Sequence, residues 1–168
     1  FHQLDVPAIA AVNGHAIGAG MDLATMCDIR VASKRASFAE SFLRVGLVSG
    51  DGGAWYLPRV IGHAKAMEMA LTCCMLDADE AKNWGLVTHV TDPEDLLDKA
   101  YELADKITSF APKSIRLNKR LLRQSGDLPL ESALDLAASF QAIAQNTQDQ
   151  REAVLALLES RAPDFKGA

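Results

Sequence analysis

A glycine-rich stretch between two apolar runs constrains the fold of this chain more than any other feature. The apolar run AIAAV comes first, and the stretch NGHAIGAGMDLATMCDIR, Asn13 to Arg30, leads from it into the second run, IRVA. Short apolar runs bounded by turn residues are typical of buried strands. We therefore expect a strand, a tight glycine turn and a helix that begins near Ala19, with the carboxylate of Asp22 in its first turn.

Two interpretations of this turn stay open from the residues alone. The spacing of Gly14, Gly18 and Gly20 matches neither G-x-G-x-x-G nor a P-loop, so these modes of nucleotide binding are not indicated. The first N–H groups of the following helix have no intrahelical acceptors and carry the positive end of the helix dipole, so they could stabilise an oxyanion. A plain strand-to-helix connection that uses glycine for its backbone freedom explains the same residues.

Composition limits the architecture and the partners. A chain of 168 residues with 49% hydrophobic side chains can bury one sizeable core, and its net charge of −5 disfavours broad binding to nucleic acid or acidic membranes. Cys27, Cys73 and Cys74 have neither disulfide nor metal spacing, and Cys27 stands in an apolar run. We expect reduced thiols, no metal and no membrane span. The start at Phe1, inside a turn-like segment, suggests a fragment or a processed piece.

The pattern changes character near residue 90. Before it, the short β-rich runs PAIAAV, DIRVAS and LVTHV alternate with helical pieces such as Ala64 to Thr72, which predicts strand-helix units of an α/β fold. After it, the chain is amphipathic and helical. The predicted helix starts are Pro93 after Asp92, Pro112, and the capping boxes Asp77 with Glu80 and Thr147 with Gln150.

The order of motifs resembles the crotonase superfamily of enoyl-CoA hydratases and isomerases. The resemblance runs from PAIAAVNGHAIGAGMDLATMCDIRVAS through FAES, VGLVSGDGG, LPRVIG, AMEMALT and EAKNWGLVTHV to the C-terminal APDFKG. It covers this chain but only the C-terminal two-thirds of a family member, so the segment that supplies the other oxyanion donor is not in this sequence. The implied fold is a spiral of strand-helix units in residues 1–92, followed by a helical trimerisation region in residues 93–168.

The resemblance implies acyl-CoA substrates and two backbone N–H donors that polarise the thioester carbonyl. One donor falls at Ala19, where the family usually has glycine, and Gly18 and Gly20 shape the turn. The first acid/base glutamate of the hydratases is Asp22 here, one methylene shorter. The second would fall at Phe42.

Two carboxylates compete for the role of that missing second glutamate. Glu40 lies two residues before Phe42, on the same side of a strand only if no kink intervenes, so we do not transfer the role to it. Asp51 stands in the turn SGDGG, where isomerising and dehalogenating relatives place an aspartate one residue earlier, at Gly50. Asp51 is therefore either the replacement acid/base group or the N-cap of a helix starting around Gly52.

Further residues are candidates for substrate contact. His15 faces either the coenzyme A channel or, more simply, a hydrogen-bonding neighbour, and Trp55 is a candidate for the acyl pocket together with Phe42. Trp84 is expected to pack a helix against the sheet. In the family, basic residues of the C-terminal helices approach the coenzyme A phosphates, which makes Phe165 and Lys166 candidates here.

The prediction is therefore an enoyl-CoA hydratase/isomerase that needs no cofactor beyond the coenzyme A of its substrate. Asp22, with or without Asp51, moves a proton in an enolate-like state. A double-bond isomerase is the first alternative, because isomerisation needs as little as one base. A non-catalytic oligomerisation module or an RNA-binding member is the alternative of another class. We expect a homotrimer or dimer of trimers in fatty acid metabolism, in the cytoplasm or, in a eukaryote, the mitochondrial matrix.

Overall fold

The computed structural model describes residues 1–168 and places them in two compact units. The first contains residues 1–2 and 8–103, and the second contains residues 3–7 and 104–168. No helix is both long and apolar enough to cross a membrane. The functional division into residues 1–92 and 93–168 stays a prediction.

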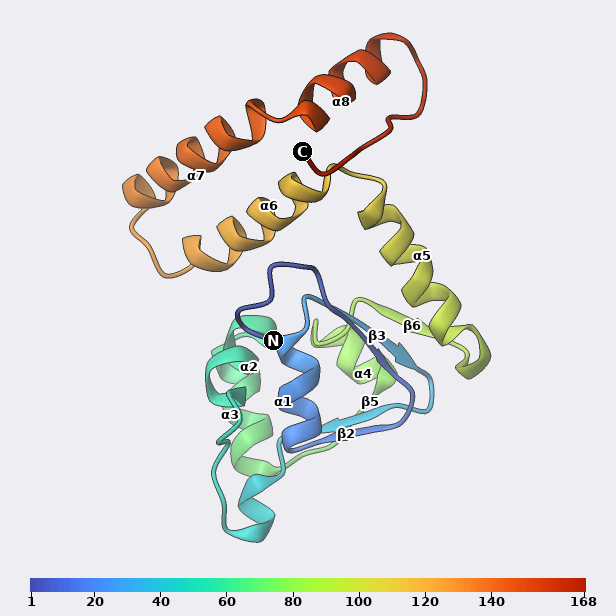
Figure 1. Cartoon of the computed structure of the whole chain (residues 1–168). Helices are drawn as coiled ribbons and strands as arrows, with labels where there is room; N and C mark the ends of the chain where they lie inside the picture. Colours follow the sequence, from blue (N-terminus) through green and yellow to red (C-terminus); the bar gives the residue numbers. More distant parts are fainter. The chain divides into compact units, whose positions relative to one another are not determined.

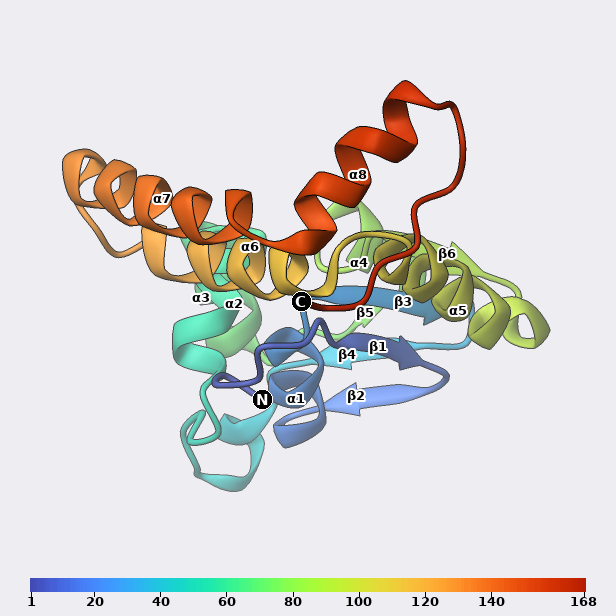
Figure 2. The same ribbon diagram turned by 45° about the horizontal axis from the view of Figure 1, so that its top comes forward.

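The first unit is built on two small sheets (Figures 1 and 2). One sheet is parallel throughout, in the order β1-β3-β6; the other, in the order β2-β4-β5, pairs β2 with β4 in parallel and β4 with β5 in antiparallel fashion. Their bounds are β1 Ile9–Val12, β2 His15–Ile17, β3 Ile29–Ser33, β4 Ser37–Ala39, β5 Leu76–Asp77 and β6 His89–Thr91.

Helices connect and cover these sheets. The chain passes from β2 through α1 to β3, and α1 packs on α2, which packs on α3. Side chains from both sheets meet those of the helices in one core that contains Met21, Phe38 and Leu57, and Trp84 packs against it as expected. The bounds are α1 Ala19–Met26, α2 Gly53–Ile61, α3 His63–Thr72, α4 Ala78–Asn83, and the 3-10 turns η1 Phe42–Val45 and η2 Pro93–Asp95. The next helix, α5 (Leu96–Thr108), begins in the first unit and ends in the second.

The strands and helix starts expected from the sequence are largely confirmed. PAIAAV, DIRVAS and LVTHV contain β1, β3 and β6. Asp77 and Glu80 form the reciprocal capping box of α4, and the Thr147 side chain accepts a hydrogen bond from the N–H of Gln150 at the start of α8. The prediction of a single glycine turn after β1 is wrong in one respect. The segment between β1 and α1 contains the short strand β2, which belongs to the second sheet.

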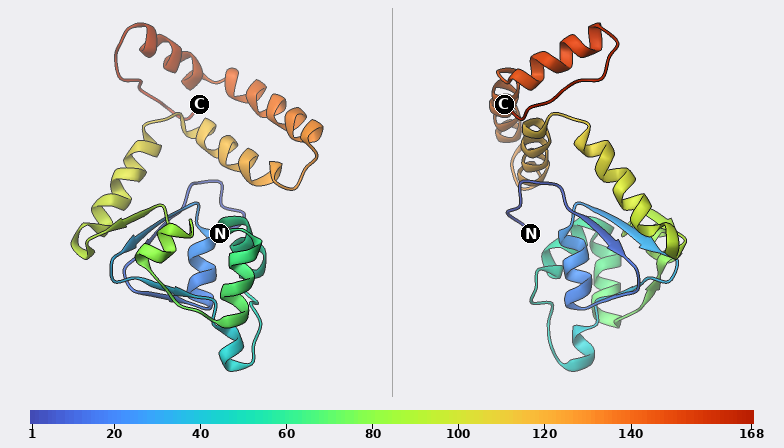
Figure 3. Two further views of the ribbon diagram at one scale, coloured as in Figure 1. Left: turned by 180° about the vertical axis from the view of Figure 1, so that it is seen from behind. Right: turned by 45° about the vertical axis from the view of Figure 1, so that its right-hand side comes forward.

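The second unit is helical. It contains α6 (Pro112–Ser125), α7 (Leu130–Gln145) and α8 (Gln148–Leu158), and the two longer helices α6 and α7 lie side by side as a hairpin (Figure 3). The C-terminal segment folds back onto the start of α8, where the carbonyl of Ala168 accepts hydrogen bonds from the N–H groups of Gln148 and Asp149. That contact satisfies backbone donors that the first turn of a helix leaves without partners.

Candidate active site

Gly18 turns the chain from β2 into α1. Its φ of +55° is a left-handed conformation that favours glycine; its N–H donates to Ala39 O and its carbonyl accepts from the N–H of Asp22, each at 2.9 Å. Ala19 is the first residue of α1 and is exposed, and its N–H has no intrahelical acceptor. The turn therefore presents a backbone donor at the positive end of the helix dipole, where a negatively charged oxygen would be stabilised.

Phe42 lies against this turn. A Cβ added to Gly18 would be 3.7 Å from Cζ of Phe42, so the aromatic ring covers the glycine at ordinary contact distance. Phe42 begins the 3-10 turn η1, whereas β4 ends at Ala39. A kink thus separates Glu40 from Phe42, and the two side chains do not share a strand face.

Asp22 is fully buried in the first turn of α1. Ser49 Oγ donates to its Oδ2 at 3.1 Å, whereas its Oδ1 has no hydrogen-bond donor. A buried carboxylate oxygen without a donor is rare in folded proteins, and such an atom is often functional. Asp22 is therefore a buried carboxylate with one oxygen open to a further hydrogen-bond donor.

Glu40 meets Asp22 beside the start of α2. Glu40 is only 3% exposed, and neither of its carboxylate oxygens has a donor. A Cβ built on Gly53 would lie 1.9 Å from Oδ1 of Asp22, 2.6 Å from Oε1 of Glu40 and 2.6 Å from Oγ of Ser49. The two carboxylates and the hydroxyl therefore converge on one point, and the missing side chain of Gly53 makes room for them. Asp22 comes from α1 and Gly53 from α2, which pack against each other (Figure 1).

The surroundings of Glu40 favour its neutral form. Burial raises the pKa of Glu40 from 4.5 to about 7, and the negative charges of Asp22 and, more weakly, Asp51 add to the rise, while the Ser49 hydroxyl opposes it. Glu40 therefore keeps its proton to a higher pH than an exposed glutamate does.

Asp51 does not cap α2. The helix begins at Gly53, its N-cap is Gly52 with a φ of +107°, and no side chain caps the helix from that residue. The N–H of Ala54 instead donates to Oγ of Ser49 at 3.2 Å. The N-cap interpretation of Asp51 is therefore wrong, because glycine in the left-handed conformation carries the chain into the helix, and Asp51 remains exposed.

His15 and Trp55 engage neighbours other than these carboxylates. Nδ1 of His15 lies 2.6 Å from Oγ of Ser37 across the β2-β4 pair, which agrees with the simpler, hydrogen-bonded interpretation of this exposed histidine. The ring of Trp55 stacks under the guanidinium of Arg59 and meets the ring of Tyr56 edge-on, with ring centroids 4.7 Å apart. Both substrate-contact assignments stay predictions.

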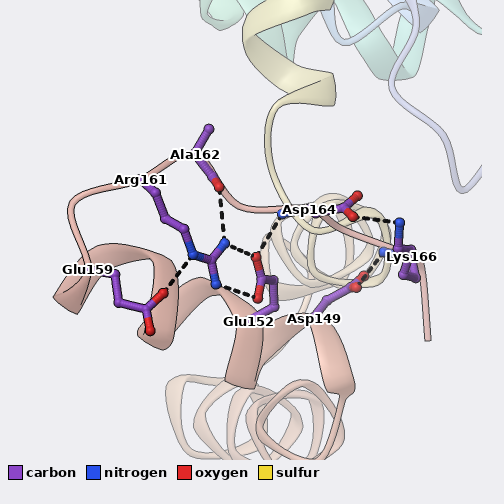
Figure 4. A network of polar contacts seen from close by, with 7 residues as sticks. All are labelled: Asp149, Glu152, Glu159, Arg161, Ala162, Asp164 and Lys166. Carbon is purple, nitrogen blue, oxygen red and sulfur yellow. Dashed lines mark hydrogen bonds and ion pairs between the residues drawn. The ribbon is translucent and has the colours of Figure 1, made fainter.

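Phe165 and Lys166 belong to the C-terminal segment of the second unit. The buried Asp149 accepts a hydrogen bond from the N–H of Lys166 at 2.7 Å, and Nζ of Lys166 pairs with Asp164 at 2.6 Å (Figure 4). Asp149 also accepts a hydrogen bond from the N–H of Gly167 at 2.8 Å. Phe165 is half-buried. A coenzyme A phosphate would compete with Asp164 for Lys166, and this role also stays a prediction.

An ion-pair network also holds the C-terminal segment in place. The guanidinium of Arg161 binds both Glu152 and Glu159, and the N–H of Asp164 donates to Glu152 (Figure 4). The hydrogen bond from Arg161 holds the pKa of Glu152 well below its usual value, at about 2. These contacts fix the backbone on which Phe165 and Lys166 stand.

Sequence reasoning missed the pairing of Glu40 with Asp22. The sequence alone does not assign the role to Glu40, because a kink before Phe42 would take it off the shared strand face. The turn η1 is such a kink, yet Glu40 still lies beside Asp22. The signal that could have found the pair is Gly53, which follows the turn SGDG and begins α2 with a residue that has no side chain. Cys27 is buried in the core, as expected.

Comparisons with known proteins identify a family and several similar proteins. The family model described as enoyl-CoA hydratase/isomerase matches residues 1–168. Similar curated proteins include the (E)-benzylidenesuccinyl-CoA hydratase of Thauera aromatica, 40% identical over 96% of this chain and 63% of its own length. The 1,2-epoxyphenylacetyl-CoA isomerase of Escherichia coli is 39% identical over 98% of this chain and 63% of its own length.

A solved structure extends the likeness to the fold. The enoyl-CoA hydratase of Bacillus anthracis superposes with a TM-score of 0.97 at 36% identity, covering 99% of this chain and 65% of that one. The chain thus spans 63% of the length of these two curated relatives. With the family model matching from end to end, the chain belongs to the enoyl-CoA hydratase/isomerase family, and its α/β fold is crotonase-like.

Proposed function

We propose that the full-length protein acts on an acyl-CoA thioester through an oxyanion-stabilised enolate, with Asp22 as the acid/base group. The observation that carries this proposal is the position of Asp22: a fully buried carboxylate with one oxygen lacking a donor, three residues after the open N–H of Ala19. A proton acceptor and an oxyanion donor on the same helical turn suit enolate chemistry.

The proposed proton transfer proceeds as follows. The N–H of Ala19 and a second donor, from a part of the protein outside this chain, hold the thioester oxygen. Asp22 takes a proton from the α or γ carbon, and the electron pair of that C–H bond moves toward the thioester oxygen to form the enolate. Return of a proton to the other carbon shifts the double bond. In hydration, a carboxylate takes a proton from water, hydroxide adds to the β carbon and the α carbon gains a proton.

Isomerisation is the second candidate reaction, and Phe42 favours it. In the hydratases that this sequence resembles, the position of Phe42 carries the second glutamate, and here an aromatic ring covers the turn at Gly18 instead. One base suffices for a double-bond shift, whereas addition of water in those hydratases uses both carboxylates. The similar proteins include both a hydratase and an isomerase, which supports either reaction.

The remaining assignments belong to the same proposal. Phe42 and Trp55 line the acyl site, His15 lies at the coenzyme A channel, and Phe165 and Lys166 approach its phosphates. Asp51 is the alternative second acid/base group, because it is exposed on the turn before α2 and its charge reaches Glu40. The helical unit forms a trimer, no cofactor other than the substrate's coenzyme A is required, and the pathway is fatty acid metabolism.

A non-catalytic or RNA-binding role is the competing hypothesis. The net charge of −5 opposes RNA binding, because binding to nucleic acid relies on neutralised phosphates. A salt-sensitive RNA mobility shift by the full-length protein would favour that role over catalysis.

The direct experiment compares acyl-CoA turnover by the full-length protein with its Asp22→Asn and Asp51→Asn variants. We expect Asp22→Asn to lower turnover on the order of a hundredfold, the usual scale for loss of an acid/base group. Asp5→Asn, which changes an exposed aspartate of the other unit, is the matched control. Wild-type rates in Asp22→Asn and Asp51→Asn on every active thioester would refute the carboxylate chemistry.

A further inference from the structure

We propose that Glu40 is the positioning residue of this site: in its protonated form it donates a hydrogen bond to Oδ1 of Asp22 and holds the base in place. The pairing itself follows from the geometry, whereas its effect on turnover rests on the proposed function. Glu40 acts through Asp22 and need not touch the substrate.

The geometry brings the two carboxyl groups together, and the oxygens Oδ1 of Asp22 and Oε1 of Glu40 have no donor from any other residue. Oδ1 of Asp22 and Oε1 of Glu40 lie 1.9 Å and 2.6 Å from the same point beside Gly53, so their separation is no more than the sum of these distances. Ionised carboxylates only accept hydrogen bonds and repel each other at such range. A neutral carboxyl facing a carboxylate turns this repulsion into a charge-assisted hydrogen bond.

The proton belongs on Glu40 rather than on Asp22. Ser49 donates to Oδ2 of Asp22, and the first turn of α1 favours a negative charge there. Both oxygens of Glu40 are buried without a donor at hydrogen-bond distance, and burial outweighs the opposing effect of the Ser49 hydroxyl on its ionised form. A proton on Glu40 would also give Oδ1 of Asp22 the donor that it lacks.

The charged groups around Glu40 act in the same direction. Asp22 on α1 and Asp51 on the turn before α2 are both acidic and raise the pKa of Glu40, after the larger contribution of burial. Asp77 on β5, the strand paired with β4, is occupied in capping α4. Raising the pH through about 7 therefore removes the proton and leaves two like charges in contact.

The loss of the Glu40 proton should appear in the pH profile of turnover as a fall on the alkaline side, which we call the alkaline limb. We expect turnover of the full-length protein on an active acyl-CoA thioester to fall as the pH rises through about 7. Glu40→Gln keeps an N–H donor and cannot ionise, so we expect it to retain activity and lose this limb. Glu40→Ala should lower turnover roughly tenfold to a hundredfold, the equivalent of one charge-assisted hydrogen bond. Glu68→Gln, an exposed glutamate of α3, is the control.

An infrared measurement separates this inference from the proposed function. We expect the full-length wild-type protein near pH 6 to show the C=O stretch of a buried neutral carboxyl group, and Glu40→Gln to lack it. If that band is present but no thioester is turned over, the pair stands and the proposed function fails. Any of three results would overturn the inference. Glu40→Gln could keep the infrared band, Glu40→Gln could keep the fall in turnover above about pH 7, or Glu40→Ala could turn over substrate at the wild-type rate.

Discussion

The stability of the protein should report the buried proton of Glu40 independently of any substrate. The folded state raises the pKa of Glu40 from 4.5 to about 7, so between these values it retains a proton that the unfolded chain releases. The stabilisation is fully present below the unfolded pKa and is lost as the pH rises through the folded pKa. Each pKa unit is worth about 1.4 kcal/mol, which gives a loss of about 3 kcal/mol in the free energy of unfolding.

Glu40→Gln tests this magnitude, because glutamine has the same shape and no titration. Urea unfolding of the full-length wild-type protein and the variant, at one protein concentration and from about pH 4 to about pH 8, gives the difference at each pH. We expect wild type to lose about 3 kcal/mol relative to Glu40→Gln over this range. Parallel pH profiles for the two proteins would refute the reasoning, because they would mean that Glu40 ionises in the folded state as it does in the unfolded chain.

Two further predictions use glycine and aspartate substitutions. Gly53→Ala places a Cβ 1.9 Å from Oδ1 of Asp22, so turnover should fall on the order of a hundredfold. Gly14→Ala has no atom within 4 Å of the new Cβ and should leave turnover unchanged. Equal rates in the two variants would contradict the convergence of side chains at Gly53. Asp149→Asn disturbs two partly buried hydrogen bonds to the C-terminal segment and should cost about 2–3 kcal/mol in chemical unfolding. Asp164→Asn changes an exposed ion pair and should cost much less, so equal losses would argue against the role of Asp149.

Local signals predicted much of the fold because they depend on few neighbours. The apolar runs become β1, β3 and β6, and α1 begins at Ala19 as the glycine turn predicts. Capping residues act within one helical turn, so Asp77 and Thr147 are found where the sequence indicates. The strands β2 and β4 were harder to predict, because segments of three residues carry almost no periodicity and exist through their pairing with each other.

The candidate site was only half predictable for the same physical reason. Asp22 and Ala19 are adjacent on one helical turn, so a motif identifies both. Glu40 reaches Asp22 through a long-range contact that depends on the kink at η1 and on the missing side chain of Gly53. Neither determinant has a local pattern of charge or hydrophobicity, so the sequence alone could not assign Glu40 once a kink before Phe42 was possible.

The central claim is that Asp22 moves a substrate proton beside the oxyanion turn. Its most direct test is solvent deuterium exchange into the α or γ carbon of an active acyl-CoA thioester, measured with the full-length protein and with Asp22→Asn. We expect exchange by wild type and a loss on the order of a hundredfold in Asp22→Asn, with thioester binding retained. Equal rates of exchange in the two proteins would contradict it.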